Sequence, residues 1–248
     1  MSESIDWQVE TLRITAFPVE IDSVSPSELW DKHKGELKPE VHIQPDSINR
    51  RNARHRNGEI YLVKTPSQID WRYVLPLDDT SPESGLPVWG NLNNELNPFL
   101  EFSKEFLQNP VIFPVFRLAF GAILMKPRSD LISSNEYLAD FLPHLDLEDA
   151  TDFGYQISRG RTSDVVNELH INRLSRWQVL TLERKGSTLD PADDGNLDLV
   201  ETLFAARLEL DINSSPDYGP PLNSDLLSSA FEELVDMGLE IARRGDVK

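Results

Sequence analysis

The chain contains two segments with the same order of structural signals, and this repetition constrains the fold more than any other feature. Ser25-Pro26-Ser27-Glu28 and Ser133-Ser134-Asn135-Glu136 both have the Ser-x-x-Glu spacing of a capping box, which marks the start of a helix. Each follows an apolar run that is expected to form a strand. Each precedes a stretch with two-residue alternation and then a longer helical pattern. The sequence therefore predicts strand–helix–hairpin–helix, twice.

This pattern predicts the α+β class, with a mainly antiparallel sheet and long helices packed on one face. We expect a first half over residues 1–110 and a second half over residues 111–248. A chain of 248 residues can form one large domain or two closely packed halves, and we expect one compact unit.

Hydrophobic alternation locates the strands of the predicted sheet. Residues 115–125 are apolar on both sides, as in a central strand that is covered on both faces. Residues 7–17 change phase midway, which indicates either a bulge near Thr11 or a strand covered on both faces. Residues 60–65 and 69–75 alternate around a Pro-Ser-Gln turn and predict a hairpin. A second hairpin is expected over 153–159 and 168–183, followed by a strand at 206–212.

Helical periodicity appears over residues 91–108 and again over 224–244. In the first helix, Pro98 either causes a kink or marks the true first turn, with Asn97 as the cap. In the second, Gly245 occupies the position that favours a left-handed residue after a helix.

Charge and cysteine usage narrow the class of protein. The net charge is −18, which would repel nucleic acid and anionic lipid unless a local basic face opposed it. The chain has no cysteine, which fits a cytoplasmic protein and excludes disulfides and thiolate metal sites. No apolar run is long enough to span a membrane. The acidity is typical of a soluble protein, or of an acidic surface that binds a basic partner.

The densest basic run lies within residues 42–57, which are polar and predict an irregular segment. An exposed loop inside an acidic chain is the favoured interpretation, and we expect no nucleic-acid partner. The basic side chains of this run are Arg50, Arg51, Arg54, His55 and Arg56.

The segment 168–177 contains the most unusual polar residues. If Ile171 and Trp177 face inward, alternation turns Arg173 inward as well. A buried guanidinium needs a carboxylate partner. Three interpretations follow: a structural ion pair, a pocket arginine for an anionic ligand, or a bulge that turns Arg173 outward. The candidate carboxylates are Glu148, Asp149 and Asp152.

Four runs within residues 115–183 carry a resemblance to a known family. They are Arg117-Leu118-Ala119-Phe120-Gly121-Ala122, Tyr137-Leu138 with Phe141-Leu142-Pro143, Asp152-Phe153-Gly154-Tyr155-Gln156-Ile157, and Ile171-Asn172-Arg173-Leu174-Ser175-Arg176-Trp177. The chain resembles a sporadically distributed family of uncharacterised prokaryotic proteins of about this length. The resemblance implies no established activity, and the patchy distribution resembles that of mobile defence or toxin–antitoxin genes.

In several relatives the second hairpin carries an Asn-Arg-Pro-Arg segment, where this chain has Ser158-Arg159-Gly160-Arg161. This departure weakens the expectation of a ligand site at that point. The candidate ligand-binding residues are Arg159, Arg161, Asn172, Arg173 and Trp177.

An acidic segment near residue 190 resembles a calcium-binding loop, with carboxylates at loop positions one, five, nine and twelve. Ala192 stands where the third ligand is needed, and no clear helix precedes the loop. An acidic surface loop is therefore favoured over a weak cation site. The candidate ligands are Asp190, Asp194, Asp198 and Glu201.

No catalytic motif is recognisable, because nucleophile elbows, phosphate loops and dinucleotide fingerprints are all absent from the sequence. We therefore expect a non-catalytic binding or accessory protein that acts through protein–protein contacts, in prokaryotic defence or a toxin–antitoxin pair. No cofactor is implied, and enzymatic activity is disfavoured. The alternative is a small anionic-ligand sensor, or an unrecognised enzyme, that uses a cleft between the two halves.

Overall fold

A computed structural model describes residues 6–34, 36–43, 48–55, 58–75, 85–109, 112, 114–188 and 197–246. The strands are β1 (Gln8–Pro18), β2 (Glu40–Ile43), β3 (Asn49–His55), β4 (Gly58–Lys64), β5 (Ile69–Val74), β6 (Gly90–Asn91), β7 (Val115–Arg128), β8 (Gly154–Thr162), β9 (His170–Thr188) and β10 (Leu197–Ser214). The α-helices are α1 (Pro26–Lys34), α2 (Leu92–Leu107), α3 (Leu131–Ala139) and α4 (Leu227–Arg244).

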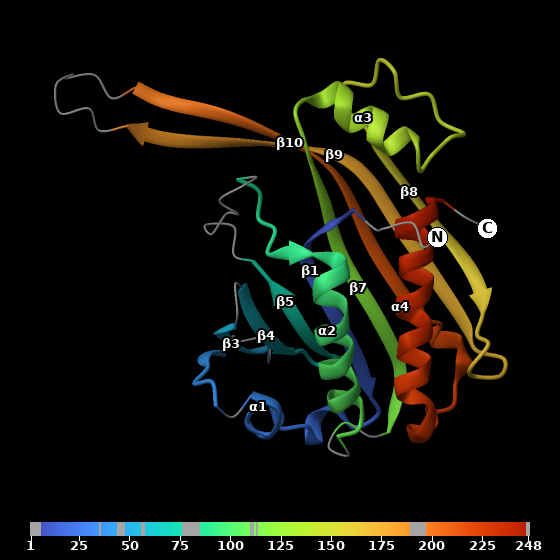
Figure 1. The fold of residues 1–248 in the computed structure, drawn as a ribbon. Helices are drawn as coiled ribbons and strands as arrows, with labels where there is room; N and C mark the ends of the chain where they lie inside the picture. Colours follow the sequence, from blue (N-terminus) through green and yellow to red (C-terminus); the bar gives the residue numbers. More distant parts are fainter. Residues whose placement is uncertain are drawn as a thin grey trace.

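All the strands of the described residues belong to one antiparallel sheet. Its order is β2-β3-β4-β5-β1-β7-β10-β9-β8, and the short β6 also pairs with β1. The predicted α+β class with a mainly antiparallel sheet is confirmed (Figure 1). β1 and β7 pair at the centre, so the sheet is continuous between residues 1–110 and residues 111–248.

The two parts of the chain follow the same order of elements. In the first part, β1 is followed by α1, by the meander β2-β3-β4-β5 and by α2, and β5 returns to pair with β1. In the second part, β7 is followed by α3, by the meander β8-β9-β10 and by α4, and β10 returns to pair with β7. The first part therefore holds a four-stranded meander where the sequence predicted a hairpin, and the second holds a three-stranded meander where it predicted a hairpin and one further strand.

The irregular segment predicted over residues 42–57 is wrong, because β2 and β3 form there. The long arginine side chains of β3 contact neighbouring elements instead of solvent alone. The Arg50 guanidinium lies 4.3 Å from the centre of the Tyr61 ring, and Arg51 donates to Ser27 Oγ at 2.6 Å. A strand built from such residues has no hydrophobic alternation, so the sequence pattern could not reveal it.

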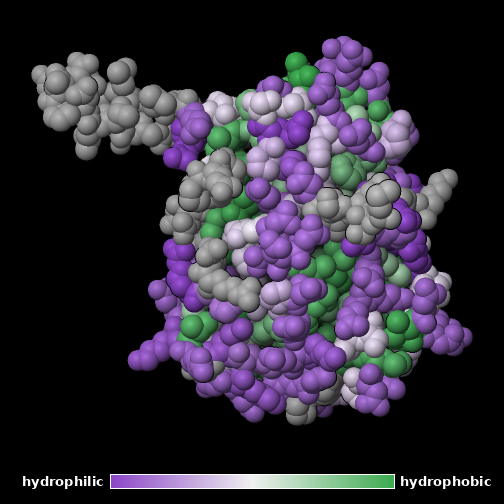
Figure 2. Space-filling view, in the orientation of Figure 1, coloured by the Kyte–Doolittle hydropathy of each residue, from purple (hydrophilic) through white to green (hydrophobic). Residues whose placement is uncertain are grey.

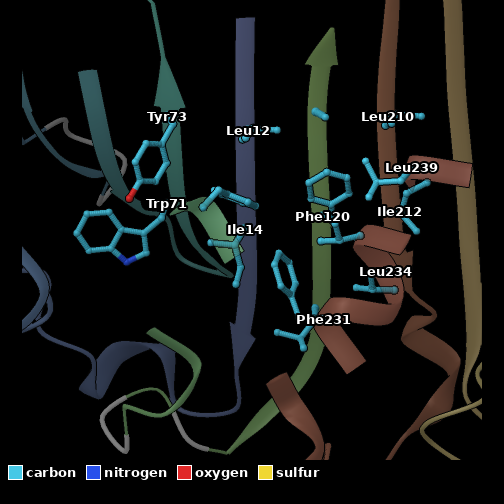
Figure 3. Packing of buried hydrophobic residues seen from close by; sticks show 14 of the residues in the cluster. Leu12, Ile14, Trp71, Tyr73, Phe120, Leu210, Ile212, Phe231, Leu234 and Leu239 are labelled. Atoms are coloured by element: carbon cyan, nitrogen blue, oxygen red, sulfur yellow. The ribbon is translucent and has the colours of Figure 1, made fainter. Parts of the chain in front are cut away.

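Aromatic side chains of the helices pack against one face of the sheet, which we call the helix face. Trp30 of α1 stacks on Trp71 of β5, with ring centres 5.5 Å apart. Phe231 of α4 contacts Phe120 of β7 edge to face at 6.2 Å. Figure 3 shows Trp71, Phe120 and Phe231 on this face, with Leu12 and Ile14 of β1 between Trp71 and Phe120. Figure 2 shows a mostly hydrophilic surface on this side, with a hydrophobic strip between α2 and α4.

The core also joins segments that are distant in sequence. Trp7, which precedes β1, is buried and donates its indole N–H to the carbonyl oxygen of Ala242 in α4 at 2.9 Å. Its ring contacts Tyr137 of α3 at 5.3 Å. The start of the first part is therefore packed against the last two helices of the second.

The register confirms the bulge predicted near Thr11, because the pairing of β1 with β7 shifts between Val9 and Thr11. Val9 and Leu12 are three positions apart, so regular alternation would place them on opposite faces of the sheet. The bulge places both on the helix face, where both are buried.

The structure supports one helix cap and corrects two. Ser25 Oγ accepts from the Glu28 N–H at 3.3 Å, as the first capping box predicts. The second box lies one turn earlier than expected, because Asp130 is the N-cap and Ser133 is its partner. Asn91 caps α2, so Pro98 lies inside that helix and Asn97 is not a cap.

The C-terminal end of α4 requires a glycine. Gly245 has a φ of 79°, and its N–H donates to the Ile241 carbonyl at 2.8 Å. A β-carbon at this position would lie 1.8 Å from the Phe141 carbonyl oxygen. The prediction of Gly245 as the residue that ends the last helix is confirmed.

The strands β9 and β10 are longer than predicted and leave the body of the molecule as a two-stranded ribbon (Figure 1). β9 pairs with β8 only up to Gln178, and β10 pairs with β7 only from Phe204 onward. Between these limits and their far ends, the two strands pair with each other. At the base of the ribbon, a small hydrophobic cluster contains Leu86, Val88, Met125, Leu180, Leu182, Leu203 and Ala205.

Candidate functional site

The arginine that the sequence predicted to face inward does so. Arg173 of β9 is 2% exposed, and its Nη2 lies 3.1 Å from Glu240 Oε2 of α4. The same carboxylate accepts from Arg161 of β8 at 2.8 Å. The partner is therefore Glu240, and the expectation of Glu148, Asp149 or Asp152 is wrong. Burial lowers the pKa of Arg173, the Arg161 charge lowers it further, and Glu240 opposes both.

The second predicted anion anchor is also held by a carboxylate. Arg159 of β8 donates through Nε and Nη2 to the two oxygens of Asp246, at 2.6 and 2.7 Å. The Tyr155 hydroxyl donates to the same carboxylate at 3.0 Å. The hydrogen bonds from Arg159 lower the pKa of Asp246, and burial has the smaller, opposite effect of raising it. The space between Arg159 and Arg173 has no room for a water molecule.

The other two predicted ligand residues lie apart from these arginines. Trp177 is fully buried in the core, where its ring stacks on Phe141 and its N–H donates to Ser175 Oγ at 3.1 Å. Asn172 is on the opposite face of β9 and donates to Asn213 of β10 at 3.3 Å. The structure therefore brings Arg159, Arg161 and Arg173 together and separates Asn172 and Trp177 from them.

The calcium-loop candidates do not assemble in the part of the chain that the structure describes. Asp198 and Glu201 belong to strand β10, where a calcium loop would continue into a helix. Asp190 and Asp194 lie outside the described residues. The described residues contain no group of three or more histidine or acidic side chains that could hold a metal ion.

The face of the sheet opposite the helix face, which we call the open face, carries a network of charged residues. Arg176 joins Glu209 at 2.9 Å, and Glu209 also accepts from Arg207 at 3.3 Å. Arg207 lies 3.7 Å from Glu10. Burial raises the pKa of Glu10, which Arg207 opposes. The network spans β1, β9 and β10 and alternates in sign.

At the seam between the two parts, four residues form one row across the open face. Arg72 of β5 pairs with Arg13 of β1, Arg13 pairs with Gly121 of β7, and Gly121 pairs with Asp211 of β10. Two arginines thus stand directly opposite each other on adjacent strands. Like charges in such positions repel unless anions compensate them.

Arg72 and Arg13 differ in how closely a carboxylate approaches each guanidinium group. Arg72 donates to Asp70 Oδ2 at 2.5 Å, and Asp70 is fully buried and also accepts from Thr15 Oγ1 at 2.6 Å. Arg13 has its nearest carboxylate, Asp211, at 3.6 Å, which is too long for a hydrogen bond. Among the described residues, the Nε atoms of Arg13 and Arg72 are buried and have no acceptor.

These residues line a hollow of about 250 Å³ on the open face. Gly121 makes room for the Arg13 side chain, because a β-carbon at Gly121 would lie 2.7 Å from Arg13 Nε. The lining residues are Thr11, Arg13, Arg72, Val74, Gly121, Ala122, Ile123, Glu209, Leu210 and Asp211.

Sequence reasoning missed this hollow, although signals for it were present. Arg13 and Arg72 occupy the polar positions of two alternating strands, and Gly121 interrupts an apolar run. A glycine inside a strand often marks a place where another group approaches the backbone closely. What the sequence lacked was the pairing of β1 with both β5 and β7, which places the three residues in one row.

The comparisons with known proteins supply no identity. No protein-family model matches the chain, and the search of curated proteins finds no match. The longest α-helix of the described residues has 18 residues, and none of the described helices is apolar enough to cross a membrane.

Proposed function

We propose that this chain is a non-catalytic binding protein that acts through contact with another protein. The observation that supports the proposal best is the ribbon of β9 and β10. Over residues 183–188 and 197–202 the two strands pair only with each other among the described residues. A two-stranded ribbon alone in water has little stability of its own, so a role in contact accounts for its length.

The charge of the chain supports a partner with a basic contact surface. The net charge is −18, and carboxylates are frequent in the segment that joins and ends the ribbon, which includes Asp190, Asp193, Asp194, Asp198 and Glu201. Long-range attraction would speed the encounter with a basic protein and would weaken as salt is added. The same field disfavours nucleic acid.

We also infer that the two parts of the chain descend from a duplicated unit. The matching order of strand, helix, meander and helix supports this inference, as does the return of the last meander strand to the first strand in each part. The resemblance of residues 115–183 to a patchily distributed prokaryotic family makes defence or a toxin–antitoxin pair the setting that we propose.

Affinity capture from the native host at native expression levels tests the proposed function. The variant replaces residues 185–200 by Asn-Gly, a dipeptide suited to a two-residue hairpin turn. Ile132→Ser, on the exposed surface of α3, is the matched control for a change elsewhere. We expect a partner that the wild type and Ile132→Ser capture and the shortened ribbon loses. Identical capture by all three proteins would contradict the proposal.

A further inference from the structure

The hollow on the open face has groups of both signs on opposite sides. Arg13 and Arg72, from β1 and β5, supply positive charge on one side of Gly121. Asp211 and Glu209, from β10, supply negative charge on the other side. The division follows from the row across the sheet, because Gly121 separates Arg13 from Asp211 by one strand.

Some hydrogen-bonding groups on the two sides of the hollow are not used by the hydrogen bonds within the described residues. The Arg13 and Arg72 Nε atoms are buried without an acceptor in the described part of the chain. A buried donor without an acceptor is unfavourable, and more so when the group is charged. A carboxylate that reached both guanidinium groups would satisfy these donors and separate the two positive charges.

On the acidic side of the hollow, Glu209 and Asp211 also differ in how many hydrogen-bond donors they already have. Glu209 is engaged by both Arg176 and Arg207. Asp211 Oδ1 accepts from Asn213 at 3.2 Å, while its Oδ2 has only the 3.6 Å approach of Arg13. The Asp211 side chain is 37% exposed, so it can accept from a group that enters the hollow.

Apolar side chains complete the lining between these charges. The side chains of Val74 and Ile123, which are partly buried, contribute to the wall of the hollow. A ligand that fits this lining carries a carboxylate, an ammonium group and an apolar portion. A simple anion would meet two carboxylates of the hollow and the field of a chain with net charge −18, whereas a zwitterion has no net charge to repel.

We propose that the hollow at the seam of the sheet binds a small zwitterion, an α-amino acid with an apolar side chain. Its carboxylate would lie on Arg13 and Arg72, and its ammonium group would replace Arg13 as the partner of Asp211. This site is independent of the ribbon and of the proposed protein partner, so each proposal can fail without the other.

The test is a titration followed by ¹H–¹⁵N correlation spectra that include the arginine Nε–H signals. The probes are L-alanine, L-leucine and L-phenylalanine, together with 4-methylpentanoate and isoamylamine. The last two are leucine without its ammonium group and leucine without its carboxylate. We expect a saturable shift of the Arg13 Nε–H signal with at least one amino acid, and weaker binding of 4-methylpentanoate and isoamylamine.

Two variants locate the site and one matched variant controls for charge. Arg13→Lys keeps the charge but loses the Nε–H, so the dissociation constant should rise about tenfold. Gly121→Ala fills the space that Arg13 Nε occupies and should abolish binding without removing any charged group. Arg50→Lys alters an arginine of β3 that lies over the Tyr61 ring and is not among the residues that line the hollow, and it should leave binding unchanged.

Three outcomes would overturn the proposal. The first is no saturable shift with any of the amino acids. The second is binding of 4-methylpentanoate as tight as that of L-leucine, which would remove the role of Asp211. The third is unchanged binding in Gly121→Ala, provided that circular dichroism confirms that this variant is folded.

Discussion

His33 of α1 illustrates how burial sets the protonation state of a single residue. Its ring lies among Trp71, Phe102 and Phe106, with ring centres 6.0–6.3 Å away. Burial, together with the smaller effect of the charges of Lys32 and Lys34, lowers the pKa of His33 to about 4. The imidazole is therefore neutral at pH 7 and remains neutral in mild acid.

We predict that His33 makes the folded state less stable as the pH falls from 6.5 to about 4. Within this window the unfolded chain binds a proton at His33 and the folded chain does not. The loss is at most about 1.4 kcal/mol per pH unit. His33→Phe removes the titrating group and should flatten the dependence. Urea unfolding of both proteins at pH 6.5 and pH 5 measures it, and equal slopes would contradict the prediction.

A second prediction concerns Arg173, whose charge is buried against Glu240. Glu240→Gln leaves this guanidinium without a counter-charge, so we expect the free energy of unfolding to fall by about 3 kcal/mol. Adding Arg173→Met should restore much of the loss, because a well-packed apolar side chain replaces the unpaired charge. Glu232→Gln, on the exposed side of α4, is the control and should have little effect.

Denaturant unfolding of the single, double and control variants measures these differences. A double variant that is less stable than Glu240→Gln alone would show that Arg173 contributes through contacts other than this ion pair.

At the scale of single residues, alternation predicted which way Arg173 faces but not its partner. The period of two in residues 169–177 fixes the inward face whatever the rest of the chain does. Glu240 lies 67 residues later on a helix, and only the packing of α4 on β9 brings it close. The Asp130 cap was missed for a different reason, since Asp-x-x-Ser and the overlapping Ser-x-x-Glu compete for the same helix start.

Gly238 lies in the middle of α4, where glycine is an unfavourable helix former. The reason is contact with the sheet, because a β-carbon here would lie 2.8 Å from Phe120 Cε1 of β7. The small residue allows the helix to approach the central strand closely.

We predict that Gly238→Ala lowers the stability by about 1 kcal/mol, because overpacking against Phe120 outweighs the gain in helix propensity. Ser229→Ala, at an exposed position of the same helix, should not destabilise. Thermal unfolding of the two variants makes the comparison. Phe120→Leu in the Gly238→Ala background should recover part of the loss, and a further additive loss would contradict the steric explanation.

At the scale of elements, strands with hydrophobic alternation were predictable and polar strands were not. β4, β5 and β7 have apolar residues at the expected spacing. β3 has arginines at three of its seven positions, reading Asn-Arg-Arg-Asn-Ala-Arg-His, and it is a strand because β2 and β4 pair with it. The far part of the ribbon likewise depends on cross-strand pairing rather than on burial.

For the whole molecule, we expect an element to contribute less to stability the farther it lies from the central pair of strands, β1 and β7. The ribbon is remote from this centre. We predict that replacing residues 185–200 by Asn-Gly leaves the urea midpoint of the body almost unchanged, because those residues of β9 and β10 pair only with each other among the described strands. A large fall in the midpoint would show that the ribbon supports the body.

The order of strands could not be predicted from the sequence alone. Alternation identifies which face of a strand is buried, but β5-β1-β7-β10 requires three pairings of residues that are far apart in the chain. The hollow depends on the same pairings, since its arginines come from β1 and β5 and its carboxylates from β10. The composition of the candidate site was visible in the sequence, and its assembly was not.

The hydrogen bond between Trp7 and Ala242 has a consequence for synthesis on the ribosome. The indole of Trp7 cannot reach its acceptor until a residue 235 positions later has left the exit tunnel. Contacts of such long sequence separation form slowly and late. A nascent chain in which α4 has not yet emerged therefore leaves the aromatic surface beside β1 without the partner that covers it in the folded protein.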